Sequence, residues 1–360
     1  MTIAVHGSYF GYNFGDTLLC RLFSNWVHDA GETTVLPLAS EGNRKIIGAE
    51  RKGVLATSGA RGLVFCGGGY FSQPAENVKS WSRRAYMRHI WLGEAALARG
   101  TPYVILGVGA GPMTQPWLRA RVARVFEGAQ EVVVRDDESY AFLRELGVQR
   151  PITVAMDAAL GVGDGAVQAS DPPAVLIEAR KSAQNVLLLH TNAYPNEGEL
   201  DVIRTGLAWA ATQPSVAVIL ASDSVGRKRP IKWPALLSKE FPELANRTHI
   251  ALYNGSPDSL VSLLGQVDGI MTTKLHVGIV GTALERPVIS VPRHTKTPRF
   301  YRQIGISNTC VLAEGDWKPQ VKDRLEAWLG GHREDFAEMR RVRAGFSYRD
   351  VIAKFVAGLS

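Results

Sequence analysis

The sequence is poor in the features that mark disulfide-rich and metal-binding proteins. It has three cysteines in 360 residues, and Cys20, Cys66 and Cys310 stand far apart without a CxxC motif or a His/Cys cluster. HxxxE, DxD and clustered carboxylates are missing as well. We therefore expect reduced, buried thiols, and we expect neither a metal nor another cofactor.

Long apolar runs and blocks of like charge are also missing. No stretch approaches the roughly 18 apolar residues of a membrane-spanning helix, and the N-terminal MTIAVHGSYF is too short and interrupted for a signal peptide. We expect a cytoplasmic protein. The net charge of +7 includes no Lys/Arg block, which argues against a nucleic-acid partner. It suits an anionic small substrate, and it leaves open a loose peripheral contact with the inner face of an anionic membrane.

Short apolar runs alternate with helical patterns along the whole chain. The expected strands are 3–6, 34–38, 62–66, 103–106, 131–134, 152–154, 185–190, 215–221, 249–253, 269–272 and 288–291. The expected helices are 16–30, 83–99, 116–128, 137–146, 197–212, 234–240, 257–266 and 275–284. This alternation predicts an α/β fold with mostly parallel, doubly wound sheets.

The length is about twice that of a usual domain, which favours two domains. Periodicity is lost in Gly161–Pro173, where Gly, Asp and Pro accumulate, so this segment is the expected linker. We predict Rossmann-like domains at 1–165 and 174–320 that face each other across a cleft. Helices over 321–360 are expected to pack back on the first domain.

Ligands of open parallel sheets bind beyond the carboxyl ends of the strands. After the first strand, Asn13 is expected to face the cleft, and Asp16 either caps a helix or faces the cleft too. Two later strand ends, CGGGYFSQP and LGVGAGP, are rich in glycine. Gly68, Gly69 and Gly109 there form either plain turns or a place where the backbone closely approaches an anion.

Polar side chains follow other strand ends of the first domain. Arg135 comes directly after a strand in VVVRDDES, and it is either paired with Asp136 or Asp157 or free to hold a carboxylate or phosphate. Tyr70 and Gln73 follow the GGG turn and are candidates for contact with an acceptor.

Basic groups gather in the second domain between Met271 and Phe300. Lys274 and His276 stand at a strand-to-helix turn, while His294 and Lys296 stand in the loop expected after the next strand. His190 follows an earlier strand and is either a satisfied core residue or part of the cleft lining. Such a concentration of cations favours an anionic ligand.

Several of these segments, taken together and in order, resemble the polysaccharide pyruvyl transferase family. They are NFGDTLL, the GGG strand end, VGAGP, VVVRDDES, VAMDAAL and TTKLH…PVISVPRHTK. The resemblance implies a two-domain fold similar to the GT-B glycosyltransferases. It also implies transfer of a pyruvyl group from phosphoenolpyruvate to sugar hydroxyls of a cell-envelope exopolysaccharide or its lipid-linked precursor, which forms a ketal. The family pattern has Arg-Leu-His where this chain has Lys274-Leu275-His276.

The resemblance, together with the positions of the candidate residues after strand ends, suggests their roles. Catalysis falls to His276 and Asp16, donor binding to Arg135, Lys274, Lys296, Gly68, Gly69 and Gly109, and acceptor binding to Asn13, Tyr70, Gln73, His190 and His294. Histidine suits proton transfer near neutral pH, and several cations suit the carboxylate and phosphate of the donor. Two alternatives stay open: a GT-B glycosyltransferase that uses a nucleotide sugar, and a non-catalytic member of a glycan-assembly complex.

Overall fold

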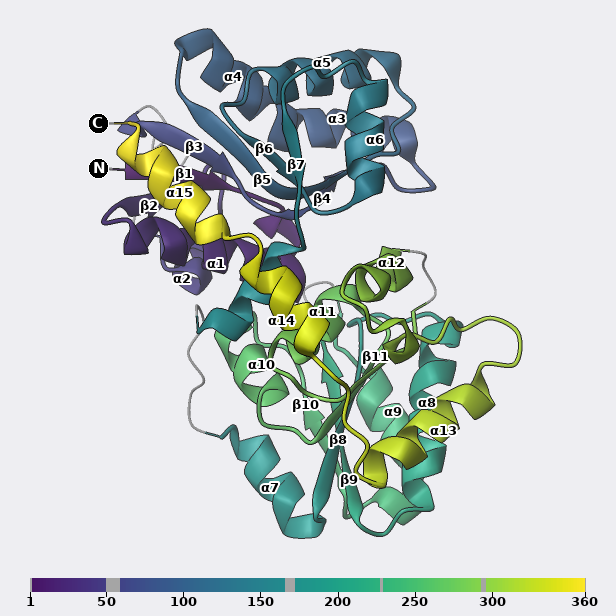
Figure 1. Ribbon diagram of the computed structural model, residues 1–360. Coiled ribbons are helices and arrows are strands. Elements are labelled where there is room, and N and C mark those ends of the chain that lie inside the picture. Colours follow the sequence, from purple (N-terminus) through teal and green to yellow (C-terminus); the bar gives the residue numbers. More distant parts are fainter. Residues whose placement is uncertain (1, 50–58, 166–171, 227–228, 293–295, 360) are drawn as a thin grey trace. The chain divides into compact units, whose positions relative to one another are not determined.

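The computed structural model describes residues 2–49, 59–165, 172–226, 229–292 and 296–359 (Figure 1). His294 lies outside the described residues, and so does the side chain of Lys296. The chain forms two compact units. The first comprises Met1–Tyr12, Asp16–Ala158 and Ala344–Ser360, and the second comprises Asn13–Gly15 and Ala159–Arg343.

The first unit is built on a parallel sheet of seven strands, in the order β2-β1-β3-β5-β6-β7, with β4 paired to β5. The strands are β1 (Thr2–His6), β2 (Thr33–Val35), β3 (Gly62–Phe65), β4 (Gly68–Phe71), β5 (Tyr103–Ala110), β6 (Val132–Val134) and β7 (Ile152–Val154). Every residue of β5 is buried, as expected for a central strand covered on both faces. All carboxyl ends lie at one edge because all the pairings are parallel.

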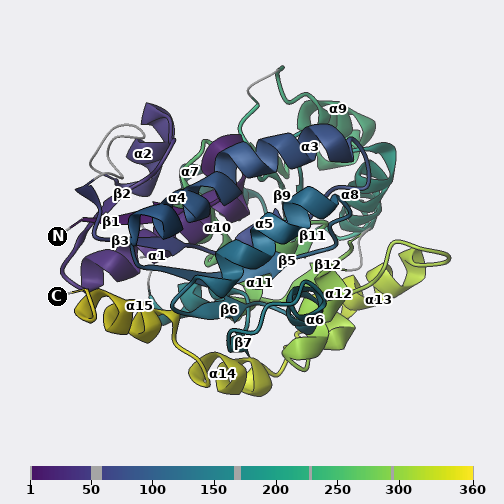
Figure 2. The same cartoon turned by 90° about the horizontal axis from the view of Figure 1, so that it is seen from above.

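Helices cover this sheet. They are α1 (Phe14–Asp29), α2 (Glu41–Ile47), α3 (Val78–Ala85), a π-helix (Tyr86–Ile90), α4 (Trp91–Arg99), α5 (Pro116–Glu127), α6 (Asp137–Glu145) and α15 (Tyr348–Ala357). The last helix completes the unit, since the Tyr348 ring stacks on Trp26 of α1 and its hydroxyl donates to the carbonyl oxygen of Met156 at 2.6 Å. In Figure 2, α3 and α4 run on as one helical segment.

The second unit holds a five-stranded parallel sheet in the order β10-β9-β8-β11-β12. Its strands are β8 (Asn185–Thr191), β9 (Val216–Ser222), β10 (Thr248–Ala251), β11 (Gly269–Thr272) and β12 (Val288–Ser290). Its helices are α7 (Ala174–Ser182), α8 (Glu197–Ala211), α9 (Trp233–Glu240), α10 (Pro257–Leu264), α11 (Leu275–Ala283), α12 (Lys296–Gln303), α13 (Lys318–Leu329) and α14 (Ala337–Ala344). One core joins α8, α9 and α13 to the sheet.

The alternation of strands and helices is confirmed, but several local predictions are wrong. Gly68 and Gly69 lie in the short strand β4 rather than in a turn. Lys296 begins helix α12, where we expected a loop. The helix expected over 83–99 begins at Val78 and contains a π-helix, and α2 and α7 were not predicted. Glycine content concealed β4, because its pairing with β5 is a tertiary effect that outweighs weak local strand propensity.

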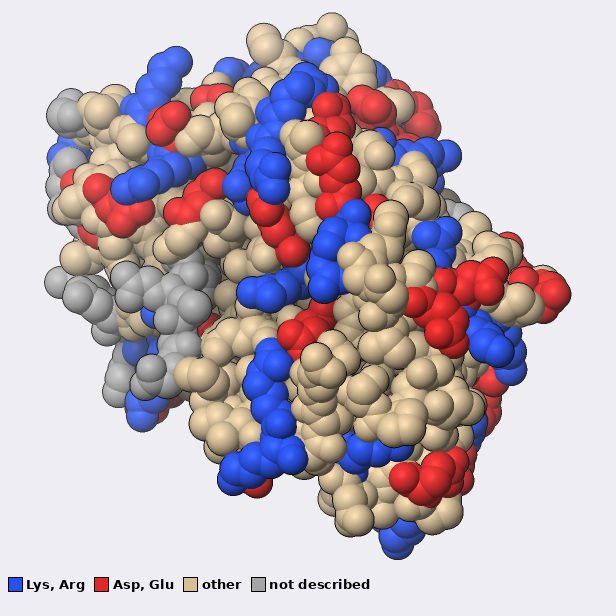
Figure 3. All heavy atoms as spheres, turned by 60° about the horizontal axis from the view of Figure 1, so that its bottom comes forward, with Lys and Arg blue, Asp and Glu red and all other residues tan. Residues whose placement is uncertain are grey.

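The C-terminal stretch consists of α13, α14 and α15. Only the residues from Ala344 onward belong to the first unit, while α13 packs on the sheet of the second. None of the described helices is both long and apolar enough to cross a bilayer. On the face shown in Figure 3, Lys and Arg side chains are interspersed with Asp and Glu.

Candidate functional site

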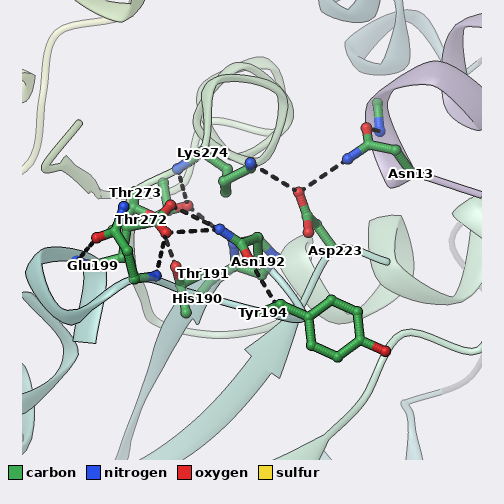
Figure 4. Close-up of polar contacts among 12 residues, drawn as sticks. Asn13, His190, Thr191, Asn192, Tyr194, Glu199, Asp223, Thr272, Thr273 and Lys274 are labelled. Carbon is green, nitrogen blue, oxygen red and sulfur yellow. Dashed lines mark hydrogen bonds and ion pairs between the residues drawn. The ribbon is translucent and has the colours of Figure 1, made fainter. Parts of the chain in front are cut away.

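The second unit gathers polar side chains where β8, β9 and β11 end (Figure 4). Lys274 follows β11 and stands at the N-cap of α11 in an extended conformation. Asp223 follows β9 directly. Asn13, although distant in sequence, is part of this unit. Parallel pairing brings these strand ends to one edge, which is where such sheets bind ligands.

Asp223 is the centre of this cluster. Its side chain is only 3% exposed. Asn13 Nδ2 donates to its Oδ2 at 3.2 Å, and Lys274 Nζ lies 3.6 Å from the same oxygen. In Figure 4, Asn13 and Lys274 approach the carboxylate from different elements. Burial raises the pKa of Asp223, although Lys274 and Asn13 oppose the rise by favouring the carboxylate.

The ion pair with Asp223 occupies only part of the hydrogen-bonding capacity of Lys274. About a third of its side chain (32%) is exposed, and an ammonium group has three N–H donors. A ligand at the N-terminus of α11 can therefore accept a hydrogen bond from Lys274 while the pair with Asp223 persists.

His276 lies in the first turn of α11 and is held closely by the backbone of Gly15. A Cβ atom on Gly15 would come within 2.1 Å of His276 Nδ1, so only glycine fits there with the imidazole in this position. The Gly15 amide donates to Asn13 Oδ1 at 3.1 Å, which fixes the turn. One short segment thus contacts both Asp223 and His276.

A layer of buried hydrogen bonds lies beneath Lys274. Thr272 Oγ1 bonds to His190 Nδ1 at 3.1 Å and accepts from the Lys274 amide at 3.0 Å. The Thr191 and Thr273 hydroxyls bond at 2.8 Å. His190 is fully buried, and burial, helped by the charge of Lys274, lowers its pKa from 6.5 to about 3. His190 therefore supports the turn that carries Lys274, and it has no exposed surface with which to contact an acceptor.

Arg135, in the first unit, is engaged by carboxylates. It is 8% exposed, donates from Nη1 to Asp157 Oδ2 at 3.0 Å, and holds Nε 3.7 Å from Asp136 Oδ2. A Cβ on Gly109 would lie 2.8 Å from Nε, so this glycine makes room for the guanidinium. The sequence left open whether Arg135 is paired with a carboxylate or free to hold an anionic ligand, and the geometry shows that it is paired.

The first unit has a cavity of about 340 Å³, which we call the first-unit cavity. It brings together three of the predicted residues, Asp16, Gly69 and Tyr70. Tyr70 is largely buried, and its hydroxyl donates to the Cys66 carbonyl oxygen at 2.7 Å. Gln73 lies elsewhere, with Oε1 accepting from the Thr114 amide at 2.8 Å.

Other residues that line the first-unit cavity were not predicted from the sequence. They are Ser8, Trp81, Arg84, Ala85, Arg88 and His89. Trp81, Arg84 and Arg88 are spaced as residues on one face of a helix, and this spacing was a signal in the sequence that could have grouped them. Gly68 has φ +125°, which favours glycine, and its missing Cβ would lie 3.6 Å from Asp16 Oδ1. Among the described residues, no three His, Cys, Asp or Glu side chains are grouped to hold a metal ion.

Solved structures with a similar fold are sugar-nucleotide and glycosyl-transfer enzymes. The UDP-GlcNAc 2-epimerase from Methanocaldococcus jannaschii has a TM-score of 0.61 at 13% identity, over 96% of this chain and 99% of that one. A glycosyltransferase from Rickettsia africae gives 0.62 at 11%, over 99% and 97%. Anabaena Alr3699/HepE in complex with UDP gives 0.59 at 12%, over 99% and 98%. At these identities the likeness establishes the fold, which is of the GT-B type.

Among curated proteins, no sequence matches this chain. The profile of one family, described as polysaccharide pyruvyl transferase, matches residues 13–295. That match spans Asn13, the cavity residues other than Ser8, Arg135 and the turn that carries Lys274 and His276. The chain therefore belongs to the polysaccharide pyruvyl transferase family.

Proposed function

We propose that the protein transfers a pyruvyl group from phosphoenolpyruvate to two hydroxyls of a sugar, and that it makes a pyruvate ketal on a cell-envelope glycan or its lipid-linked precursor. The family match supports transfer to a polysaccharide. The observation that carries the proposal is the placement of His276, held against Gly15 in the first turn of the helix that Lys274 caps.

The donor carries a carboxylate and a phosphate, and burying such charge without partners is costly. Lys274 supplies a partly exposed ammonium group at the N-terminus of α11. The side chain of the N-cap residue Lys274 makes no capping hydrogen bond, and the backbone N–H groups of the terminus also favour an anion. Lys296 begins α12 and stays in the proposal as a second cation. Arg135 is already balanced by two carboxylates and is assigned a structural role.

The chemistry needs proton transfer at carbon and at oxygen. His276 donates a proton to the CH2 carbon of the enol, which becomes a methyl group and leaves an oxocarbenium-like C2. One sugar hydroxyl adds to C2, the C2–O bond to phosphate breaks, and a second hydroxyl closes the ketal. Two hydroxyl protons are released: one returns to the His276 imidazole and replaces the proton given to carbon, and Asp16 accepts the other, which leaves with the phosphate. The products are the ketal and inorganic phosphate.

The test replaces His276 with Asn and measures turnover at saturating phosphoenolpyruvate. Loss of a general acid–base group costs about 10²–10⁴-fold in rate, and we expect a fall in that range with little change in donor affinity. His332→Asn is the matched control, because His332 is exposed after α13. A His276→Asn enzyme that keeps the wild-type rate would remove His276 from the chemistry.

A nucleotide-sugar transferase is the second candidate, because one structural neighbour contains UDP and another is a glycosyltransferase. Such an enzyme usually offers a carboxylate to the ribose of its donor. Here Glu285 is the only acidic residue between Met271 and Phe300, and Arg340 of α14 already binds it at 2.6 Å. Thermal shift separates the two: phosphoenolpyruvate should raise the melting temperature, whereas stabilisation by UDP alone would favour the second candidate.

A further inference from the structure

The first-unit cavity carries positive charge for which the proposed reaction gives no use. Arg84 lies in the last turn of α3 and Arg88 lies in the π-helix, and both exposed side chains line the cavity. The π-helix widens the turn, with the Trp91 amide bonded to the Tyr86 carbonyl oxygen five residues back. Inserted π-turns are frequent at functional sites. The guanidinium of Arg88 stacks over the Phe10 ring at 4.9 Å, which restricts its orientation.

Aromatic rings form other walls of the cavity. Trp81 is half-buried, and Tyr70 stacks on His89 with ring centroids 4.6 Å apart and planes at 26°. Sites for small organic ligands measure about 300–1,000 Å³, and aromatic rings give this polar cavity flat surfaces on which a ligand can lie. The volume of about 340 Å³ fits one such ligand.

The histidine of the cavity adds no charge near neutral pH. His89 Nδ1 lies 2.9 Å from His6 Nε2, and burial lowers the pKa of both rings. Charge in the cavity therefore comes from Arg84 and Arg88, opposed by the single carboxylate of Asp16.

We infer that the first-unit cavity binds the acceptor sugar, and that Arg84 and Arg88 hold an anionic group carried by that sugar, a phosphate or a carboxylate. This inference rests on the proposed function. The guanidinium fork matches both groups. The ring of the sugar lies against Trp81, and a hydroxyl of the sugar meets Asp16. The enzyme thus selects charged glycans over neutral ones.

The experiment measures binding directly, without phosphoenolpyruvate, by titration calorimetry of the full chain. The probes are glucose 1-phosphate, methyl glucuronide, uncharged methyl glucoside and inorganic phosphate. The two charged sugars should bind more tightly than the neutral sugar or phosphate, and their ratio tells whether phosphate or carboxylate is preferred. The double variant Arg84→Ala/Arg88→Ala should weaken both charged sugars by at least about tenfold, since a hydrogen bond to a charged group contributes about 1.5–3 kcal/mol.

Arg83→Ala is the matched control, because Arg83 is an exposed neighbour on α3 that does not line the cavity. It should leave every affinity unchanged, and the double variant should leave phosphoenolpyruvate affinity unchanged. Equal binding of charged and neutral sugars, an equal effect of Arg83→Ala, or weakened phosphoenolpyruvate binding in the double variant would overturn the inference. If charged sugars bind as expected but no ketal forms in the presence of phosphoenolpyruvate, the proposed function fails while the cavity assignment stands.

Discussion

At the scale of single residues, the close approach of Gly15 to His276 is the most restrictive feature of the candidate site. A methyl group at residue 15 would overlap the imidazole at 2.1 Å from Nδ1 and must displace it. A misplacement of about 1 Å can cost a reaction roughly 10²-fold. We predict that Gly15→Ala lowers kcat by about that factor, measured by phosphate release.

The matched control for that prediction is Gly11→Ala. A Cβ on Gly11 would meet no atom within 4 Å, so we expect near-normal kcat and an unchanged melting temperature. An active Gly15→Ala enzyme would mean that the position of the imidazole does not matter to turnover.

Arg135 is the second residue whose role the structure sharpens. Breaking a buried ion pair costs about 3–5 kcal/mol, because a charge is left without its partner. Arg135→Met leaves Asp157 and Asp136 unbalanced, so we predict a loss of that order in the free energy of unfolding, measured in urea. Adding Asp157→Asn should recover part of it. If Arg135→Met keeps full stability but binds phosphoenolpyruvate more weakly, Arg135 is a donor anchor after all.

At the scale of elements, strands β1 and β8 both carry buried histidines near their carboxyl ends. Burial lowers the pKa of His6 and of His190 from 6.5 to about 3. In the unfolded chain these rings take up protons below about pH 6.5, whereas in the folded chain they do not until about pH 3. Stability is therefore complete above about pH 6.5 and falls as the pH drops towards 3, by at most about 1.4 kcal/mol per pH unit for each ring.

The variant His190→Asn tests this dependence. It should be less stable than the wild type at pH 7, because the bond to Thr272 changes, yet its stability should fall less between pH 7 and pH 5. Urea midpoints at the two pH values measure the difference. His332→Asn, at an exposed position, should leave the pH dependence as it is. An unchanged slope for His190→Asn would show that this ring does not stay neutral in the fold.

Element order and the parallel sheets could be predicted, because apolar runs of strand length alternate with helical periods. Strand β4 could not, since Gly68 and Gly69 carry no strand propensity and their pairing with β5 is a tertiary effect. The candidate residues were found where they lie within one or two positions of a strand end, as Lys274 and Arg135 do. The central place of Asp223 and the contact between Gly15 and His276 depend on three-dimensional proximity, which no local pattern contains.

At the scale of the whole molecule, the first unit is discontinuous and is completed by the last helix. Phe355 and Leu359 leave no space for a Cβ on Gly62, and Tyr348 joins α15 to α1. Replacing a large buried aromatic residue with alanine costs about 3–5 kcal/mol. We predict a loss of that order for Tyr348→Ala, seen as a lower melting temperature by calorimetry. The control is Ala357→Ser, which should have little effect on the melting temperature because Ala357, at the end of α15, is exposed. Equal melting temperatures for the wild type and Tyr348→Ala would contradict the packing of α15 on the first unit.

Product analysis is the decisive experiment for pyruvyl transfer. Purified protein is incubated with phosphoenolpyruvate and a panel of charged and neutral glycosides, and the products are read by mass spectrometry alongside phosphate release. We expect a glycoside heavier by one pyruvate less one water, formed in equal amount with phosphate and lost in His276→Asn. Phosphoenolpyruvate left intact with every glycoside, together with transfer from a nucleotide sugar, would contradict it.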